Sequence, residues 1–301
     1  MAVILALIIV PVLFVQYDPI DIQEERSVDM VEGATNLNLN LVASLGEVEV
    51  RFAELGSEAV KVRAHIEGRS GLFGQDNPLN LSLMHRDDVG QGGSNLTVDA
   101  AFNTYAPYPY YYLERVRYQV LVDQGLATDL NISVTTGGVV LWTEPGVVLK
   151  GLKLTATTHG AVISLNNGTV LSGDVAIHTA TGGTTLHWHN LAVVGDRTIT
   201  LEESSGPIEA TFVQHEALGG NVLLQAKDTA GAIALLVDVK GDLGAMVRTS
   251  NGLGGTDLIP LGGFTADEKV LTSASYPSRD NFVFQLNNTV GGIEATGRWT
   301  A

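Results

Sequence analysis

A tandem repeat of about 23 residues is the feature that most constrains the fold of this chain. Within residues 130–258, each copy consists of an alternating apolar–polar run, a glycine, and a second alternating run. The turn glycines are Gly137, Gly160, Gly182, Gly206, Gly231 and Gly254. A fixed period in this range is typical of a solenoid, in which each unit buries its apolar face only by stacking on its neighbours. The sequence therefore predicts an all-β solenoid of stacked Gly-turn strand–turn–strand units.

The alternating runs also predict how each unit folds. Side chains of a strand alternate between its two faces, so one face of each run is apolar and the other is polar. We expect the two strands of a unit to form a hairpin around the turn glycine, and the hairpins of 130–258 to stack into a regular array. Residues 36–129 are expected to form an N-terminal β portion of the same solenoid. Residues 259–301 are expected to hold an irregular insertion and a last repeat that caps the open end.

Fourteen consecutive apolar residues occupy positions 2–15. As a helix they span about 21 Å, against roughly 30 Å for a bilayer core. We expect a short N-terminal hydrophobic helix over 1–16, either a membrane anchor or the remnant of a signal, with a buried core element as the alternative. The acidic residues 17–35 are expected to form a linker. An anchor would place the remaining chain on the extracellular face of the cytoplasmic membrane.

The composition excludes several classes of partner. The formal net charge is −16, and only six residues are lysines. A nucleic-acid backbone attracts clusters of Lys and Arg, which this chain lacks, so no nucleic-acid partner is expected. The same charge disfavours docking on anionic lipid headgroups. With no cysteines, the chain has no disulfide, no thiolate metal ligand and no Cys nucleophile.

Three histidines fall in one repeat unit, VAIHTATGGTTLHWH at 175–189. If Gly182 lies in a hairpin turn, His178, His187 and His189 share one outer face. Two histidines at positions i and i+2 of a strand lie about 6–7 Å apart, close enough to share Zn²⁺ or Cu²⁺. Glu209 of the next unit is the nearest candidate carboxylate ligand. The patch is a candidate metal site, with exposed polar positions of a solenoid face as the alternative; no cofactor is expected otherwise.

A tyrosine-rich insertion, APYPYYY at 106–112, interrupts the N-terminal β portion, and its prolines exclude a central strand. Tyrosine presents an apolar ring with a polar tip, which suits stacking on sugars or proteins. A flap packed over an open sheet edge is the alternative. The candidate ligand-binding residues are Tyr105, Tyr108, Tyr110, Tyr111 and Tyr112.

Five Asn-x-Ser/Thr sequons occur along the chain. They are acceptor sites only in an exported protein of a lineage that glycosylates asparagine. The sequons begin at Asn80, Asn95, Asn131, Asn167 and Asn287.

No catalytic motif is found in the sequence. A polysaccharide-acting β-helix enzyme needs paired carboxylates in a cleft. Here Glu202 and Glu203 are adjacent, so they point to opposite faces of a strand. The nucleophile-elbow, phosphate-loop, zinc-protease and dinucleotide-binding patterns do not occur. The chain is therefore expected not to be an enzyme, with a β-helix enzyme kept as an alternative.

Three stretches resemble a bacterial and archaeal family of surface proteins known as putative adhesins. They are LNLNLVASLGEVEV followed by AVKVRAHIEG, then RVRYQVLVDQGLATDLNISVTTGGVVL at 115–141, and the tandem units after it. The resemblance covers about residues 36–300 and implies a β-solenoid-like domain with an adhesive role at the cell surface. We expect a non-catalytic protein that binds a glycan or a cell-surface protein. A self-assembling envelope or filament subunit, which binds copies of itself, is the alternative.

Overall fold

The computed structural model describes residues 18–71, 77–90, 93–105 and 111–301, and these form only strands and loops. The all-β prediction is confirmed for these ranges. The expected hydrophobic helix at 1–16 lies outside them. In the described part of the chain, no helix is long and apolar enough to cross a membrane.

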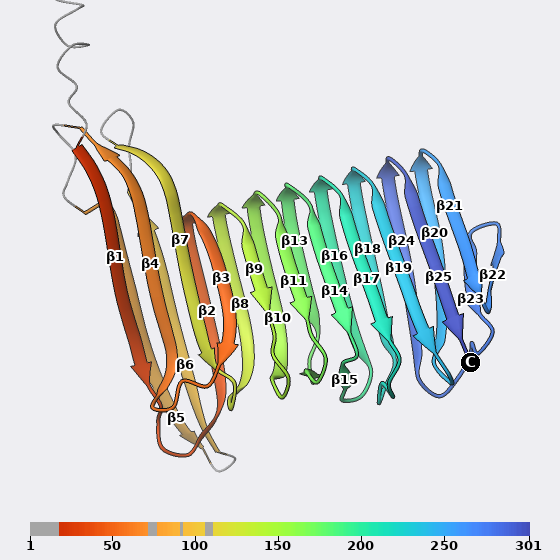
Figure 1. The fold of residues 1–301 in the computed structure, drawn as a ribbon, viewed down its shortest axis with the longest axis horizontal. Helices are drawn as coiled ribbons and strands as arrows, with labels where there is room; N and C mark the ends of the chain where they lie inside the picture. Colours follow the sequence, from red (N-terminus) through yellow and green to blue (C-terminus); the bar gives the residue numbers. More distant parts are fainter. Residues whose placement is uncertain (1–17, 72–76, 91–92, 106–110) are drawn as a thin grey trace, which may run out of the picture.

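The strands form two large sheets that run together along the long axis of the molecule, with β1 at one end and β21 at the other (Figure 1). In spatial order, the 11-stranded sheet contains β1 (Asp18–Asp29), β4 (Glu58–Ser70), β7 (Tyr111–Asp123), β3 (Glu47–Ala53), β9 (Val139–Trp142), β11 (Ala161–Leu165), β14 (Thr184–His189), β17 (Ile208–Gln214), β19 (Ile233–Lys240), β25 (Ile293–Thr300) and β21 (Thr256–Gly262).

The 14-stranded sheet faces it. Its main path contains β22 (Phe264–Asp267), β23 (Val270–Ser273), β20 (Gly244–Leu253), β24 (Asn281–Val290), β18 (Val222–Ala230), β16 (Arg197–Ser205), β13 (Val175–Thr181), β10 (Val148–Thr158), β8 (Ala127–Thr136), β2 (Ala34–Leu45), β6 (Gly93–Thr104) and β5 (Leu79–Gly90). Two short strands, β12 (Val170–Leu171) and β15 (Ala192–Val193), attach to this path beside β10.

The two strands of a repeat do not form a hairpin, so that expectation was wrong. Gly182, with φ of 109°, lies where the chain leaves β13 in one sheet and enters β14 in the other. β13 pairs in parallel with β10 and β16, and β14 pairs in parallel with β11 and β17. Each strand thus bonds to the same strand of the neighbouring repeats. This arrangement turns the apolar faces of both strands toward one core between the sheets, whereas a hairpin would leave both strands in one sheet.

The last repeat in the sequence is not the last in space, which corrects the expected cap. β24 and β25 lie between the preceding repeat, β18 and β19, and the terminal pair, β20 and β21. The irregular segment after β21 forms the antiparallel strands β22 and β23, which continue the 14-stranded sheet beyond β20. The end of the stack is therefore formed by 244–273, and the C-terminal strands are held inside it.

The terminal strand β21 leaves one edge of the 11-stranded sheet unpaired among the described strands. Gly255 O accepts from Ile293 N and Gly263 N donates to Trp299 O, so the odd-numbered residues of β21 bond to β25. Even-numbered residues face the outer edge, and one of them is Pro260, which has no N–H. A proline at this place weakens strand addition by another chain.

The expected acidic linker at 17–35 is instead largely the edge strand β1. β1 pairs in antiparallel fashion with β4 from Asp18 to Asp29. Its apolar residues alternate with the charged ones, and Val28 is buried against the core while Ile22 packs on its margin. This alternation provides one apolar face, and pairing with β4 engages the backbone groups on one side of β1.

Near the turns, equivalent inward positions of successive repeats carry polar side chains instead of apolar ones. Glu203, Asp228 and Asn288 are register neighbours on β16, β18 and β24, and all three are buried. Asp228 is fully buried; its Oδ1 accepts from Ala230 N, but its Oδ2 accepts no hydrogen bond. Burial raises the pKa of Asp228, and the neighbouring Glu203 carboxylate adds to this rise.

Replacing Asp228 with asparagine is expected to stabilise the protein at neutral pH. A raised pKa means that the folded state holds the proton of Asp228 more tightly than the unfolded state does. The contribution of Asp228 to the free energy of unfolding is therefore fully present below its ordinary pKa of about 3.9. This contribution is lost as the pH rises through the pKa of the folded state. Asn288, whose Nδ2 donates to Gly231 O and Gly292 O at 3.0 and 3.1 Å, shows that an amide fits this ladder. Urea unfolding at several pH values should show Asp228→Asn more stable near pH 7, with the difference shrinking toward acid pH. If the difference in stability between Asp228→Asn and the unmodified protein were the same at every pH, the raised pKa of Asp228 would be contradicted.

Candidate functional site

A concentration of charged side chains covers the outer surface of the 11-stranded sheet at its N-terminal end. β4 and β7 lie in the middle, with β1 on one side and β3 on the other. On β4, Val60, Val62 and Ile66 point into the core, so the intervening residues point to solvent. We call this surface the charged face. Its residues are Asp21, Gln23, Glu25, Glu47, Glu49, Arg51, Glu58, Lys61, Arg63, His65, Glu67, Arg115, Arg117 and Gln119.

The strand register places these residues in rows across the sheet. One row contains Gln23, His65, Arg117 and Glu47. The next row contains Glu25, Arg63, Gln119 and Glu49. In these two rows, basic side chains thus gather on β4 and β7, and carboxylates gather on the flanking strands β1 and β3.

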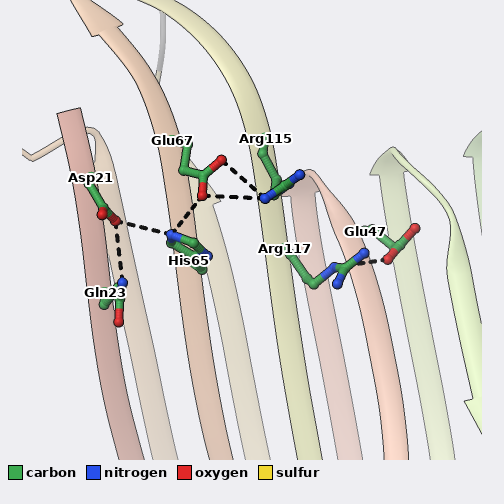
Figure 2. Close-up of polar contacts among 7 residues, drawn as sticks. All are labelled: Asp21, Gln23, Glu47, His65, Glu67, Arg115 and Arg117. Carbon is green, nitrogen blue, oxygen red and sulfur yellow. Dashed lines mark hydrogen bonds and ion pairs between the residues drawn. The ribbon is translucent and has the colours of Figure 1, made fainter. Parts of the chain in front are cut away.

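Ion pairs connect the strands of the charged face (Figure 2). His65 Nε2 lies 3.0 Å from Asp21 Oδ1 and 3.2 Å from Glu67 Oε1. Glu67 also binds Arg115, with Oε2 at 3.2 Å from Nη1. These contacts link β1, β4 and β7 into one continuous network.

Two further groups of contacts extend the network. Arg63 Nε donates to Glu25 Oε2 at 2.6 Å, and Lys61 Nζ lies 2.8 Å from Glu58 Oε2. The hydrogen bond from Arg63 lowers the pKa of Glu25, and the contact with Glu58 raises the pKa of Lys61. Both shifts favour the charged forms, so these pairs stay ionised across neutral pH.

The charged face is nearly neutral although the whole chain is strongly acidic. It carries six carboxylates and five Lys or Arg side chains, in a chain whose formal net charge is −16. Each carboxylate contacts a basic side chain. The pairs are Asp21–His65, Glu25–Arg63, Glu47–Arg117, Glu49–Arg51, Glu58–Lys61 and Glu67–Arg115. The excess negative charge therefore lies elsewhere on the molecule.

A groove of about 410 Å³ runs over the two central rows of the charged face. Arg63, His65, Arg117 and Gln119 line it from β4 and β7. Glu49, which is almost fully buried and ion-paired with Arg51, lies at its β3 side. The Glu49 Oε1 atom accepts no well-directed hydrogen bond despite this pairing. The groove thus offers both donors and acceptors on side chains held by strands.

Two aromatic side chains border the charged face. The Arg51 guanidinium carbon lies 4.5 Å from the centre of the Trp142 ring on β9, a cation–π contact. At the other end, Tyr112 is 61% exposed and lies opposite Arg69 in the β4–β7 register. One of the predicted tyrosines therefore adjoins the charged face.

Among the described residues, Tyr105 and Tyr111 do not form one surface with it. Tyr111 is only 5% exposed, and Tyr105, which is 71% exposed, follows β6 of the other sheet. Tyr108 and Tyr110 lie outside the described residues. The structure therefore gives Tyr112 a place beside the charged face and gives Tyr111 a place in the interior.

The three predicted histidine ligands are not brought together, so their expected common face was wrong. His178 is on β13 of the 14-stranded sheet, whereas His187 and His189 are on β14 of the 11-stranded sheet. The outer faces of the two sheets point away from each other. His178 Nδ1 instead lies 2.9 Å from Glu202 Oε2, and Glu209 lies opposite Thr185. Among the described residues, no three His, Asp or Glu side chains are grouped to hold a metal ion.

All five sequon asparagines are exposed on the surface. They lie on both the N-terminal portion and the repeats, at Asn80, Asn95, Asn131, Asn167 and Asn287. Their exposure permits modification, and glycosylation itself stays a prediction.

The charged face was missed from the sequence although a signal for it is present. The segments EVEVR, VKVRAHIEGR and RVRYQ each place a charged or strongly polar residue at every second position. Their assembly depends on β4 lying between β1 and β7, which are distant in the sequence. A search for alternating charge on candidate strands would have found the segments, but not their order across the sheet.

Comparisons with known proteins give distant structural likenesses. No family model matches the chain, and no curated protein matches it. A putative cell adhesion protein from Clostridium sporogenes is 12% identical, with a TM-score of 0.41 over 93% of this chain and 100% of that chain. A putative adhesin from Bacteroides fragilis is 9% identical, with a TM-score of 0.40 over 92% and 97% of the two chains. A putative adhesin from Parabacteroides merdae is 12% identical, with a TM-score of 0.36 over 91% and 95%. At these levels of similarity, the function of this chain has to be inferred from its own surfaces.

Proposed function

We propose that this protein is a non-catalytic, adhesin-like β-solenoid of the cell surface that binds its partner through the charged face. The observation that carries the proposal is this face: a nearly neutral network of paired charges around an open groove of about 410 Å³. Its side chains project from β1, β4, β7 and β3, so strands rather than loops set their positions. A site built on strands loses little conformational entropy on binding.

The proposal includes attachment to the membrane through residues 1–16, with the stack on the extracellular side. The apolar composition of 2–15 supports an anchor or signal. In this arrangement β1, which follows the apolar segment, places the charged face at the end of the stack nearest the membrane. The partner would then bind close to the base of the protein.

The alternative of self-assembly has less support from the geometry. Pro260 faces the outer edge of β21, and β22 and β23 continue past β20 at the end of the other sheet. Both features work against end-to-end strand pairing. The enzyme alternative also has less support, because every carboxylate of the charged face contacts a basic side chain instead of facing a second carboxylate across a cleft.

Binding of the purified full chain to cell-envelope and host-cell preparations tests the proposal. The double variant Arg63→Ala, Arg117→Ala removes two cations from the groove and is expected to lose saturable binding. The matched control Lys227→Ala, Arg248→Ala removes two exposed cations from the outer face of the 14-stranded sheet and is expected to bind like the unmodified protein. Equal binding by both double variants would show that the charged face is not the binding surface.

A further inference from the structure

We infer that the ligand of the charged face is an uncharged, hydroxyl-rich glycan, an inference that rests on the proposed function. The groove and its unpaired amide point to this chemical class.

The first argument is that the charges of the groove already have partners. Arg63 Nε is engaged by Glu25 at 2.6 Å, and Arg117 Nε lies 3.2 Å from Glu47. An anionic ligand would compete with these carboxylates, and a cationic ligand would compete with the guanidinium groups. A neutral ligand leaves both pairs intact. Each guanidinium has five N–H groups, so donors remain for a neutral acceptor.

The second argument is an amide at the centre of the groove. Among the described residues, the half-buried Gln119 side chain has no hydrogen-bond partner. An amide both donates and accepts, and a sugar hydroxyl does the same. Gln119 lies between Arg63 and Glu49 in its row. Two neighbouring sugar hydroxyls bound over this row would therefore meet the Arg63 donor, the Gln119 amide and the Glu49 acceptor, in that order. Binding would satisfy polar groups that are otherwise partly removed from water.

The third argument is size and surroundings. A volume of about 410 Å³ falls within the roughly 300–1,000 Å³ that small-molecule sites occupy. Exposed Tyr112 and half-buried Trp142 border the charged face at different edges. Aromatic rings with a polar tip suit the apolar side of a sugar ring. An extended oligosaccharide therefore fits better than a compact ion.

Titration of the full chain against neutral oligosaccharides, and against uronic-acid oligosaccharides of the same length, tests this inference. We expect saturable binding to a neutral oligosaccharide that changes little from low to high salt, because screening weakens only charged contacts. Gln119→Ala should weaken this binding about tenfold, the effect of losing one or two hydrogen bonds. The control Gln285→Ala removes another half-buried, outward amide, on β24, and should leave affinity unchanged.

The outcomes separate the ligand class from the proposed function. Salt-sensitive binding of uronic-acid oligosaccharides or of an acidic peptide, lost in the Arg63→Ala, Arg117→Ala variant, would overturn the neutral glycan and retain the charged face as a binding surface. Equal loss of affinity in Gln119→Ala and Gln285→Ala would place the ligand elsewhere. If envelope binding also survived in the double arginine variant, the proposed function would fail as well.

Discussion

Replacing Gly291 with alanine is expected to lower the free energy of unfolding by more than about 3 kcal/mol, because backbone strain and a backbone clash coincide. Gly291 has φ of 132°, a conformation that residues with a Cβ atom rarely adopt. A Cβ atom at this position would overlap Gly231 O and would lie 2.7 Å from Gly231 C. These are backbone atoms of the preceding repeat in the stack, so no side-chain movement relieves the overlap. The two repeats would have to separate at the turn.

Two matched variants divide this effect into its causes. Gly241 has φ of 66°, and a Cβ atom added there would meet no atom within 4 Å, so Gly241→Ala tests backbone conformation alone. Gly255 has open space and no positive φ, so Gly255→Ala should be nearly neutral. Urea unfolding should rank the three variants with Gly291→Ala least stable and Gly255→Ala most stable. Similar stability for Gly291→Ala and Gly241→Ala would contradict close stacking of the repeats at Gly231.

The strands of the repeat array could be predicted from the sequence because their signals are local. Alternation of apolar and polar residues on both sides of a glycine identifies two strands and a turn. The sheet to which each strand belongs is not local information. In a hairpin and in a turn between sheets, the residues flanking Gly182 show the same alternation, and only pairing with the next repeat distinguishes them. That pairing joins residues more than 20 positions apart.

The spatial order of the last repeats was also beyond sequence reasoning. The first inward residues of β24 and of β20 are apolar, so either strand can pack beside β18. Contacts beyond the strands accompany this order: Gly219 N, in the loop before β18, donates to Oδ2 of Asp280, just before β24, at 3.1 Å. Such single contacts between loops have no periodic pattern in the sequence.

The candidate site shows a different limit. The tyrosine and histidine predictions relied on unusual residue types close together in the sequence. In the part of the chain that the structure describes, His178 is separated from the other two histidines, and Tyr111 is separated from Tyr112. The charged face is built from common residue types in separate segments, and its first strand resembles a linker in sequence because acidic residues dominate it. Isoleucines at positions 20 and 22 were the available signal. An edge strand buries only part of one face, so its pattern is weak.

Trp188→Ala is the second substitution with a large expected effect, a loss of about 3–5 kcal/mol in the free energy of unfolding. Trp188 on β14 is 1% exposed, and its ring centre lies 5.5 Å from that of Phe212 and 5.8 Å from that of Phe282. Phe282 belongs to β24 in the opposite sheet. The tryptophan therefore connects the middle of the array to the strand inserted near its end, and its loss leaves a cavity between the sheets.

Trp188→Phe separates the packing contribution from the polar one. Trp188 Nε1 donates to the buried Gln214 Oε1 at 2.8 Å, and Leu191 N donates to the same oxygen at 3.1 Å. Phenylalanine keeps much of the ring but removes one donor; since Gln214 retains another, we expect a smaller hydrogen-bond cost, about 1 kcal/mol. Urea unfolding should therefore place Trp188→Phe between the unmodified protein and Trp188→Ala.

Ligand binding by these variants connects the fold to the proposed function. Trp188 lies in the repeats on β14, whereas the charged face is on β1, β4, β7 and β3 at the N-terminal end of the same sheet. Under conditions where both tryptophan variants remain folded, their affinity for the glycan should equal that of the unmodified protein, because neither changes a side chain at the groove. A folded Trp188→Phe protein with reduced affinity would mean that binding depends on the repeat array. The binding surface would then have to be sought along the outer faces of the repeats and not at the N-terminal end.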